Sequence, residues 1–281
     1  MKIGIVTDST ADLPANLIAE YNIEVIPLQV SIDNQSYLDG VELSADEFYQ
    51  KLQHTKTHPI TSQPALGVFM DCYQNLLKKF DAILSIHLTE KLSGTVHTAQ
   101  MAKEMIQGAK IAVIDSYSTT MGLGGLVLEA ARRSRAGINF EQLVSSINQL
   151  REQVKFFVTL DTLEFLRRGG RAGTLQAFLS SVLQIKPLLQ LVQGRIELVG
   201  KVRRRGEAIQ MMLNEFKLQL SEDSKYIIAI MHTAAENEAL KLKSIIQEQF
   251  KNAEIILNQA GPVLGTHVGP GALALIGLPV A

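Results

Sequence analysis

The chain has 281 residues, close to the upper limit for one hydrophobic core, and this length favours two domains. Hydrophobic residues make up 46% and charged residues 20%, which excludes a disordered chain. The formal net charge of −1 gives no electrostatic reason for binding to nucleic acid or to an anionic membrane, so we predict no nucleic-acid partner and at most transient membrane contact.

The N-terminal run from Met1 to Asp8 reaches an acidic residue too early for a signal peptide. No apolar run approaches the roughly 20 residues that a membrane helix needs. Cys72 is the only cysteine, so no internal disulfide can form. We therefore predict a cytoplasmic protein.

The first half of the chain alternates predicted strands with predicted helices. Short apolar runs predict strands at residues 2–6, 24–31, 82–87 and 109–115. Helical spacing and capping signals predict helices at residues 14–21, 44–52, 65–79, 96–106, 122–135 and 140–149. This alternation is typical of a mostly parallel sheet with helices outside it.

The pattern changes after about residue 153. Strands are predicted at residues 156–160, 188–192, 196–199, 226–231 and 254–257, and helices at residues 177–183, 208–220 and 236–250. Residues 265–271 are predicted to form a loop before an apolar tail at residues 272–278. The fold class is therefore α/β, with an N-terminal α/β domain over residues 1–153 and a C-terminal α+β domain over residues 154–281.

A polar turn at Ser93 and Gly94 connects the predicted strand 82–87 to the following helix. Serine is a preferred N-cap residue, and glycine lets the backbone come close to a bound group. Free N–H groups and the positive end of the helix dipole then point at one spot, which favours an anion. Because no Lys or Arg stands at the tip of the turn, the spot suits a small carboxylate. The alternative is that Ser93 only caps its helix.

Several catalytic motifs are absent. The sequence contains no GxxxxGK[ST], no GxSxG, no HExxH and no cysteine pair, which leaves little support for a P-loop kinase, a hydrolase or a zinc enzyme. What remains is a set of hydroxyl-rich loops after strands. Thr61, Ser62 and Ser93 are neutral donors, which can hold a carboxylate without a permanent salt bridge.

Seven short motifs, in their order and spacing, resemble the DegV family, whose members include the fatty-acid-binding subunits of bacterial fatty acid kinase. They are Thr7-Asp-Ser-Thr-Ala-Asp-Leu-Pro14, Thr61-Ser-Gln-Pro64, Leu92-Ser-Gly-Thr95, Asp115-Ser116, Leu163-Glu-Phe-Leu-Arg-Arg-Gly-Gly-Arg171, Lys186-Pro187 and His267-Val-Gly-Pro-Gly271. The resemblance implies a two-domain fold with a long-chain fatty acid between the domains. It also implies a protein that needs no cofactor or metal and does no chemistry alone. Such a protein presents the carboxylate to an ATP-dependent kinase subunit, which makes acyl-phosphate for phospholipid synthesis.

The resemblance also assigns roles to particular residues. It implies that the carboxylate-binding residues are Thr61, Ser62, Ser93 and Gly94, with His267 in the same hydrogen-bond network. Arg203 resembles an arginine of the family that supports kinase docking or phosphoryl transfer. Arg171 ends the matching GGR motif, where either this role or a structural one is implied.

Other interpretations of these residues remain open. One is a serine hydrolase in which Ser93 acts with His267, and Asp8 or Asp115 orients the histidine. Another is a regulatory module that binds lipid as a sensor. The basic run 201–205 is also typical of a solvated face, and Asp8 is expected to cap its own turn.

Overall fold

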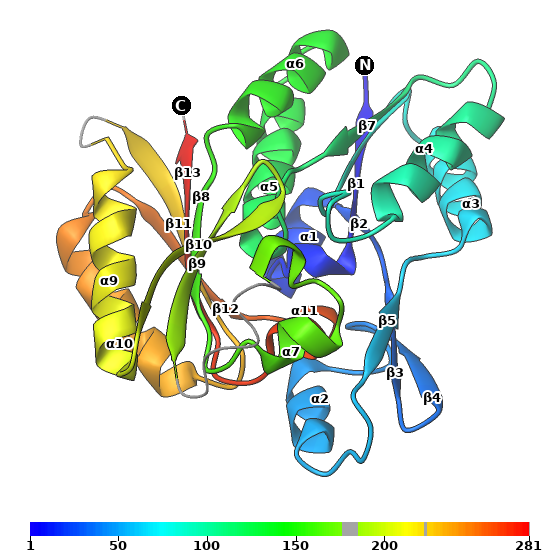
Figure 1. Ribbon diagram of the computed structural model, residues 1–281. Coiled ribbons are helices and arrows are strands. Elements are labelled where there is room, and N and C mark those ends of the chain that lie inside the picture. The colour runs from blue at the N-terminus through cyan, green and yellow to red at the C-terminus, as the bar shows by residue number, and fades with distance from the viewer. Residues whose placement is uncertain (176–184, 222–223, 281) are drawn as a thin grey trace.

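The computed structural model describes residues 1–175, 185–221 and 224–280 (Figure 1). Within these ranges the strands form a four-stranded, a three-stranded and a six-stranded sheet. The helix predicted at residues 177–183 lies outside the described residues. No helix in the described ranges has the length and apolar character needed to cross a bilayer.

The four-stranded sheet is parallel, as the alternation of strands and helices predicts. Its order is β2-β1-β6-β7, formed by Glu24–Ile26, Ile3–Asp8, Ala82–His87 and Ile111–Asp115. Every residue of β1 and β6 is buried, which explains their continuous apolar runs. The helices of this half are α1 (Ala15–Tyr21), α3 (Leu66–Leu77), α4 (Thr95–Met105), α5 (Thr120–Arg135) and α6 (Phe140–Arg151). Helices α3 and α4 share a core with one face of the sheet, and α5 packs on the other face.

The predicted single strand at residues 24–31 is wrong. It is divided into β2, in the parallel sheet, and β3 (Gln29–Ile32), which belongs to the three-stranded sheet. Pro27 stands between them and has no N–H group for a strand ladder, so the chain leaves one sheet there and enters the other. The three-stranded sheet is antiparallel, with β3 between β4 (Gln35–Leu38) and β5 (Ile60–Ser62).

The six-stranded sheet is mixed, with the order β10-β9-β8-β13-β11-β12. Its strands are β8 (Lys155–Thr159), β9 (Lys186–Val192), β10 (Arg195–Val202), β11 (Lys225–His232), β12 (Glu254–Gln259) and β13 (Leu273–Val280). The predicted apolar tail is therefore a central strand, β13, which pairs antiparallel with β8 and β11. Helices α9 (Arg205–Leu218) and α10 (Glu236–Gln249) cover the outer face of this sheet (Figure 1).

Short helices complete the described chain. They are α2 (Ala45–Leu52), α7 (Glu164–Arg168), α11 (Pro262–Val268) and the 3₁₀ turns η1 (Ser9–Ala11) and η2 (Gly173–Leu175). The predicted loop at residues 265–271 is partly wrong, because α11 continues to Val268. Gly261 and Pro262 start this helix in the manner typical of proline at the first helical position.

Helix α5 joins the two halves of the molecule. It packs against β1 and β6 on one side and against β11 and β13 on the other, and the residues involved form one buried cluster. Among the described residues, the strands of the two smaller sheets precede residue 116 and those of the largest sheet follow residue 154. A domain boundary at residue 153 agrees with this division of the sheets and stays a prediction, because the hydrophobic core continues across it.

Two buried carboxyl groups hold the start of α11 against the N-terminal half. Asp12 accepts a hydrogen bond from the Gly261 N–H at 2.9 Å. Burial raises the pKa of Asp12 to about 8, although the Thr120 hydroxyl and the Gly261 N–H act in the opposite direction. Burial likewise raises the pKa of the neighbouring Asp39 to about 6. Protonation of Asp12 is therefore linked to the docking of α11.

We predict that Asp12→Asn makes the stability of the protein less sensitive to pH between 6.5 and 8. The folded protein holds a proton on Asp12 up to a pKa of about 8, whereas the unfolded chain releases it near 3.8. The free energy of unfolding of the wild type should therefore fall as pH rises, by at most about 1.4 kcal/mol per pH unit. Asparagine keeps the acceptor oxygen and tolerates the positive φ of 46° at this position.

Urea unfolding at several pH values measures the slope of the free energy of unfolding against pH. Asp71→Asn, at an exposed position of α3, is the control for loss of a surface charge. A slope in Asp12→Asn equal to that of the wild type would contradict the role given to Asp12.

Candidate functional site

An apolar cavity of about 320 Å³ lies against the inner face of the six-stranded sheet. Phe156 and Val158 of β8 and Leu160, just after the strand, stand at every second position, so all three face the cavity. On β13 the cavity is lined by Ala272, just before the strand, and Ala274. Their side chains are too short to fill the space in front of the sheet, and the hollow results.

The residues predicted to bind a carboxylate belong to the wall of this cavity. Thr61, Ser62, Ser93, Gly94 and His267 all line it, so the structure brings together the five residues predicted to bind a carboxylate. They come from three separate elements: β5, the loop before α4, and the last turn of α11. The cavity thus combines an apolar body with a group of neutral polar side chains.

His267 contacts Thr61 directly. Its Nε2 atom lies 2.8 Å from Thr61 Oγ1. Burial, together with the nearby Arg171 and His58, lowers the pKa of His267 to about 3, so the imidazole is neutral at physiological pH. Its Nδ1 atom is buried without a hydrogen-bond partner among the described residues, in a space that a Cβ atom at Gly169 would occupy.

The unpartnered Nδ1 indicates which ring nitrogen of His267 carries the proton. An orphaned buried N–H group is rare and costly, so we infer that the proton is on Nε2. Nε2–H then donates to Thr61 Oγ1, and the hydroxyl proton of Thr61 is free to donate elsewhere. His267 in this arrangement orients Thr61 as a donor.

Ser93 does not cap helix α4, so the alternative interpretation, in which Ser93 only caps this helix, is wrong. The N-cap residue is Gly94, and no side chain caps the helix. Because the helix begins at Thr95, Ser93 stands one position too early to reach the first-turn N–H groups. Its hydroxyl instead lies 2.9 Å from Thr95 Oγ1. The Gln63 side chain lies close to Gly94, so a Cβ atom at this position would displace the end of that side chain.

Arg171 lies in the cavity wall, beside the Ser93 turn. Its Nε donates to the Leu92 carbonyl oxygen at 3.2 Å, and its Nη1 donates to the Gly169 carbonyl oxygen at 2.7 Å. The side chain therefore joins the GGR segment to the loop that carries Ser93. Burial lowers the pKa of Arg171 from its usual value. The sequence interpretation did not place this positive charge near the proposed carboxylate.

Arg203 lies elsewhere. It follows the last residue of β10, its side chain is exposed, and it is not among the described residues that line the cavity. The structure therefore does not bring it into contact with the five polar residues. Its neighbour Arg205 is engaged in ion pairs with Asp161 and Glu238.

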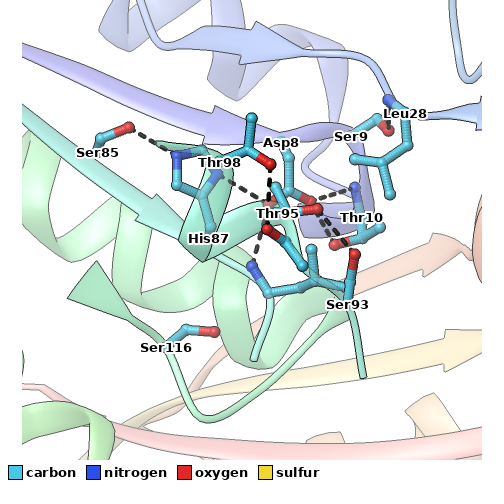
Figure 2. A network of polar contacts seen from close by, with 12 residues as sticks. Asp8, Ser9, Thr10, Leu28, Ser85, His87, Ser93, Thr95, Thr98 and Ser116 are labelled. Atoms are coloured by element: carbon cyan, nitrogen blue, oxygen red, sulfur yellow. Dashed lines mark hydrogen bonds and ion pairs between the residues drawn. The ribbon is translucent and has the colours of Figure 1, made fainter. Parts of the chain in front are cut away.

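The geometry does not support the hydrolase interpretation. His267 contacts Thr61 rather than Ser93. Asp8 accepts from the Thr10 N–H at 3.1 Å, as expected for a residue that caps its own turn. Figure 2 shows that its other oxygen lies near His87, at 3.0 Å from Nδ1. Asp115 accepts from backbone N–H groups.

A serine, a histidine and an aspartate do meet in the interior, but far from solvent. Ser85 Oγ lies 2.6 Å from His87 Nε2, and Asp8 lies on the other side of the ring (Figure 2). All three side chains are fully buried and none lines the cavity, so no substrate reaches this group. Tyr73 donates to Ser85 at 2.8 Å, so the group belongs to a buried structural network.

In residues 1–175, 185–221 and 224–280, no group of three or more His, Cys, Asp or Glu side chains is arranged to hold a metal ion. Burial raises the pKa of the Cys72 thiol to about 12, so this cysteine is a poor nucleophile.

Comparisons with known proteins match the whole chain. A DegV-domain-containing protein of Listeria innocua is 38% identical over 278 residues, which cover 98% of both chains. A DegV family protein from Thermus thermophilus, described by its fatty acid binding, superposes with a TM-score of 0.93 at 32% identity over 100% of both chains. DegV of Bacillus subtilis, described as a fatty acid binding protein, gives a TM-score of 0.93 at 31% identity over 100% of both chains. The model of the DegV family matches residues 2–279, and the chain therefore belongs to the DegV family.

Proposed function

We propose that this protein binds a long-chain fatty acid in the apolar cavity, with the carboxylate at the Thr61 end. The observation that carries the proposal is a mostly apolar cavity whose wall includes the hydrogen-bonded pair Thr61 and His267 together with Ser93. The fatty acid binding described for the Thermus and Bacillus relatives supports the same ligand class.

The apolar walls supply the affinity for such a ligand. Each CH₂ group that leaves water contributes about 0.8 kcal/mol, so a saturated chain gains more from burial than a single head-group hydrogen bond provides. The polar end then has to replace the water molecules that the carboxylate loses on binding.

Four groups near the Ser93 turn are suited to that replacement. The Thr61 hydroxyl is oriented as a donor by His267, and the Ser93 hydroxyl is not used as a helix cap. The start of α4 adds backbone N–H groups, and Arg171 adds a positive charge in the cavity wall. Hydrogen bonds to an ionised carboxylate are stronger than neutral ones, so each donor has a measurable effect.

The proposal extends to the fate of the bound acid. The protein would itself be non-catalytic and would present the carboxylate to an ATP-dependent fatty acid kinase subunit, which converts it to acyl-phosphate for phospholipid synthesis. Among the described residues the cavity has no group that resembles a phosphate-transfer centre, and His267 is neutral with its Nε2 engaged by Thr61. Arg203 is exposed at the end of β10 and is available to a partner protein.

The purified protein is expected to carry a long-chain fatty acid. Extraction with organic solvent followed by mass spectrometry should recover one acid per chain, because a ligand that fills an apolar cavity dissociates slowly. Recovery of no acid, together with no binding of a fluorescent fatty acid by the extracted and refolded protein, would contradict the proposed ligand.

Ser93→Ala is expected to weaken fatty acid binding by about 10- to 100-fold, because it removes one hydrogen bond to a charged group. Displacement of a fluorescent fatty acid measures the change. Ser146→Ala makes the same substitution at a half-buried position on α6 that is outside the cavity lining, so its affinity should equal that of the wild type. Equal affinity in Ser93→Ala and Ser146→Ala would remove Ser93 from the site.

Arg203→Ala is expected to bind fatty acid as the wild type does and to lose phosphorylation of the bound acid by the kinase subunit. The reason is that Arg203 is exposed and outside the cavity lining. The measurement is acyl-phosphate formed from labelled ATP, with Arg195→Ala, at the other end of β10, as the control.

If the wild type binds fatty acid tightly and the kinase subunit phosphorylates none of it, the presentation role is wrong. In that case the lipid-sensing interpretation takes its place.

A further inference from the structure

A second hollow, of about 170 Å³, adjoins the cavity. Phe156, Gln190 and Leu191 line both spaces. A residue that lines two neighbouring cavities stands between them, so these three residues form a partition. We name this set the partition.

The strand register places the two spaces end to end. Along β8 the first cavity is lined by Phe156, Val158 and Leu160, and the second hollow is lined by residues 154–157. Along β9 the first cavity is lined by residues 189–191 and the second hollow by residues 190–193. The two strands are antiparallel, and Phe157 is opposite Gln190. On both strands, therefore, the lining changes from the first cavity to the second hollow at the residues of the partition.

The turn before α5 also runs past the partition. Thr119 and Thr120 line the first cavity, whereas Tyr117 and Ser118 line the second hollow. Three separate segments of the chain thus change from one space to the other at the partition. This agreement indicates that the partition is the end wall of the first cavity.

Phe156 is the largest side chain of the partition and is held on several sides. A Cβ atom at Gly122 would lie 3.3 Å from the Phe156 ring, so helix α5 approaches the ring closely. Ile276 is the direct strand partner of Phe156 and is fully buried, whereas Ala274 and Ala272 line the cavity nearer its polar end. The inner face of β13 thus changes from small to large residues at the level of Phe156.

The hollow beyond the partition has a more polar wall. Arg151 lies over the Tyr117 ring, with its guanidinium carbon 4.0 Å from the ring centre, and donates to the Asp115 carbonyl oxygen at 2.8 Å. Val154 and Val192 supply apolar surface in the same space. A terminal methyl group is better placed against Phe156 than among these polar groups.

We propose that Phe156, with its neighbour Leu191 on β9, is the chain-length stop of the fatty acid site. This inference rests on the proposed function, because it assumes that the acyl chain points from the Ser93 turn toward β8. The terminal methyl group of the preferred acid contacts Phe156, and a longer acid cannot be accommodated unless the ring moves. Removal of the ring joins the two spaces and admits longer chains.

The proposal gives a definite dependence of affinity on chain length. For the wild type, each added CH₂ strengthens binding about fourfold until the chain reaches the stop, since each buried CH₂ adds a similar increment. Beyond that length the affinity falls. In Phe156→Ala the rise continues through at least one further two-carbon step before it falls.

The experiment measures the dissociation constants of saturated acids from lauric to behenic acid by displacement of a fluorescent fatty acid. Wild type, Phe156→Ala and the milder Phe156→Leu are compared, so that a result remains if the alanine variant fails to fold. Phe157→Leu is the matched control, since Phe157 lines the second hollow but not the first cavity and its ring packs against Phe216. Ala274→Leu adds bulk on the cavity face and should shift the preference toward shorter acids.

The outcomes separate this inference from the proposed function. A longer optimum in Phe156→Ala or Phe156→Leu, with the optimum of Phe157→Leu unchanged, is the expected result. Binding with the wild-type optimum in both Phe156 variants would overturn the chain-length stop and leave the fatty acid site intact. Absence of binding of every acid to the wild type would overturn the proposed function and this inference with it.

Discussion

The hydrogen bond between Thr61 and His267 joins segments 206 residues apart in the sequence, and the polar end of the cavity depends on it. One partner comes from the edge strand β5 and the other from the short helix α11. Desolvation keeps the imidazole neutral, so it positions a hydroxyl without adding a charge of its own, and Arg171 is the source of positive charge in the cavity wall. The contact therefore fixes the position of a hydroxyl donor in the site.

The position of α11 depends in turn on packing against the N-terminal half. Gly265 leaves room for Phe48 and Tyr49 of α2, and Tyr49 donates to the Ala260 carbonyl oxygen at 2.9 Å. The Asp12 carboxyl group accepts a hydrogen bond from the Gly261 N–H at the start of α11. Small residues and buried acceptors thus bring a C-terminal helix onto an N-terminal sheet, and the cavity is enclosed between the halves.

Much of this arrangement could be predicted from the sequence, because local patterns specify it. The apolar runs of β1 and β6 and the capping box at Ser44 and Glu47 appear in the structure where they were expected. The five polar residues predicted by family resemblance line one cavity. What could not be predicted depends on long-range packing: the central position of β13, the helical state of residues 262–268 and the place of Arg171 in the cavity wall. The alternation of Phe156, Val158 and Leu160 could have indicated a cavity-facing side of β8, but no local signal shows which partner that side faces.

The central claim is that the ligand lies with its carboxylate at the Ser93 turn and its methyl end toward Phe156. A crystal structure of the protein with a bound saturated fatty acid tests this most directly. The account predicts a carboxylate oxygen within hydrogen-bond distance of both Thr61 Oγ1 and the Ser93 hydroxyl, with the alkyl chain along the inner face of β8. A chain in the reverse orientation, or an acid bound outside this cavity, would contradict the account.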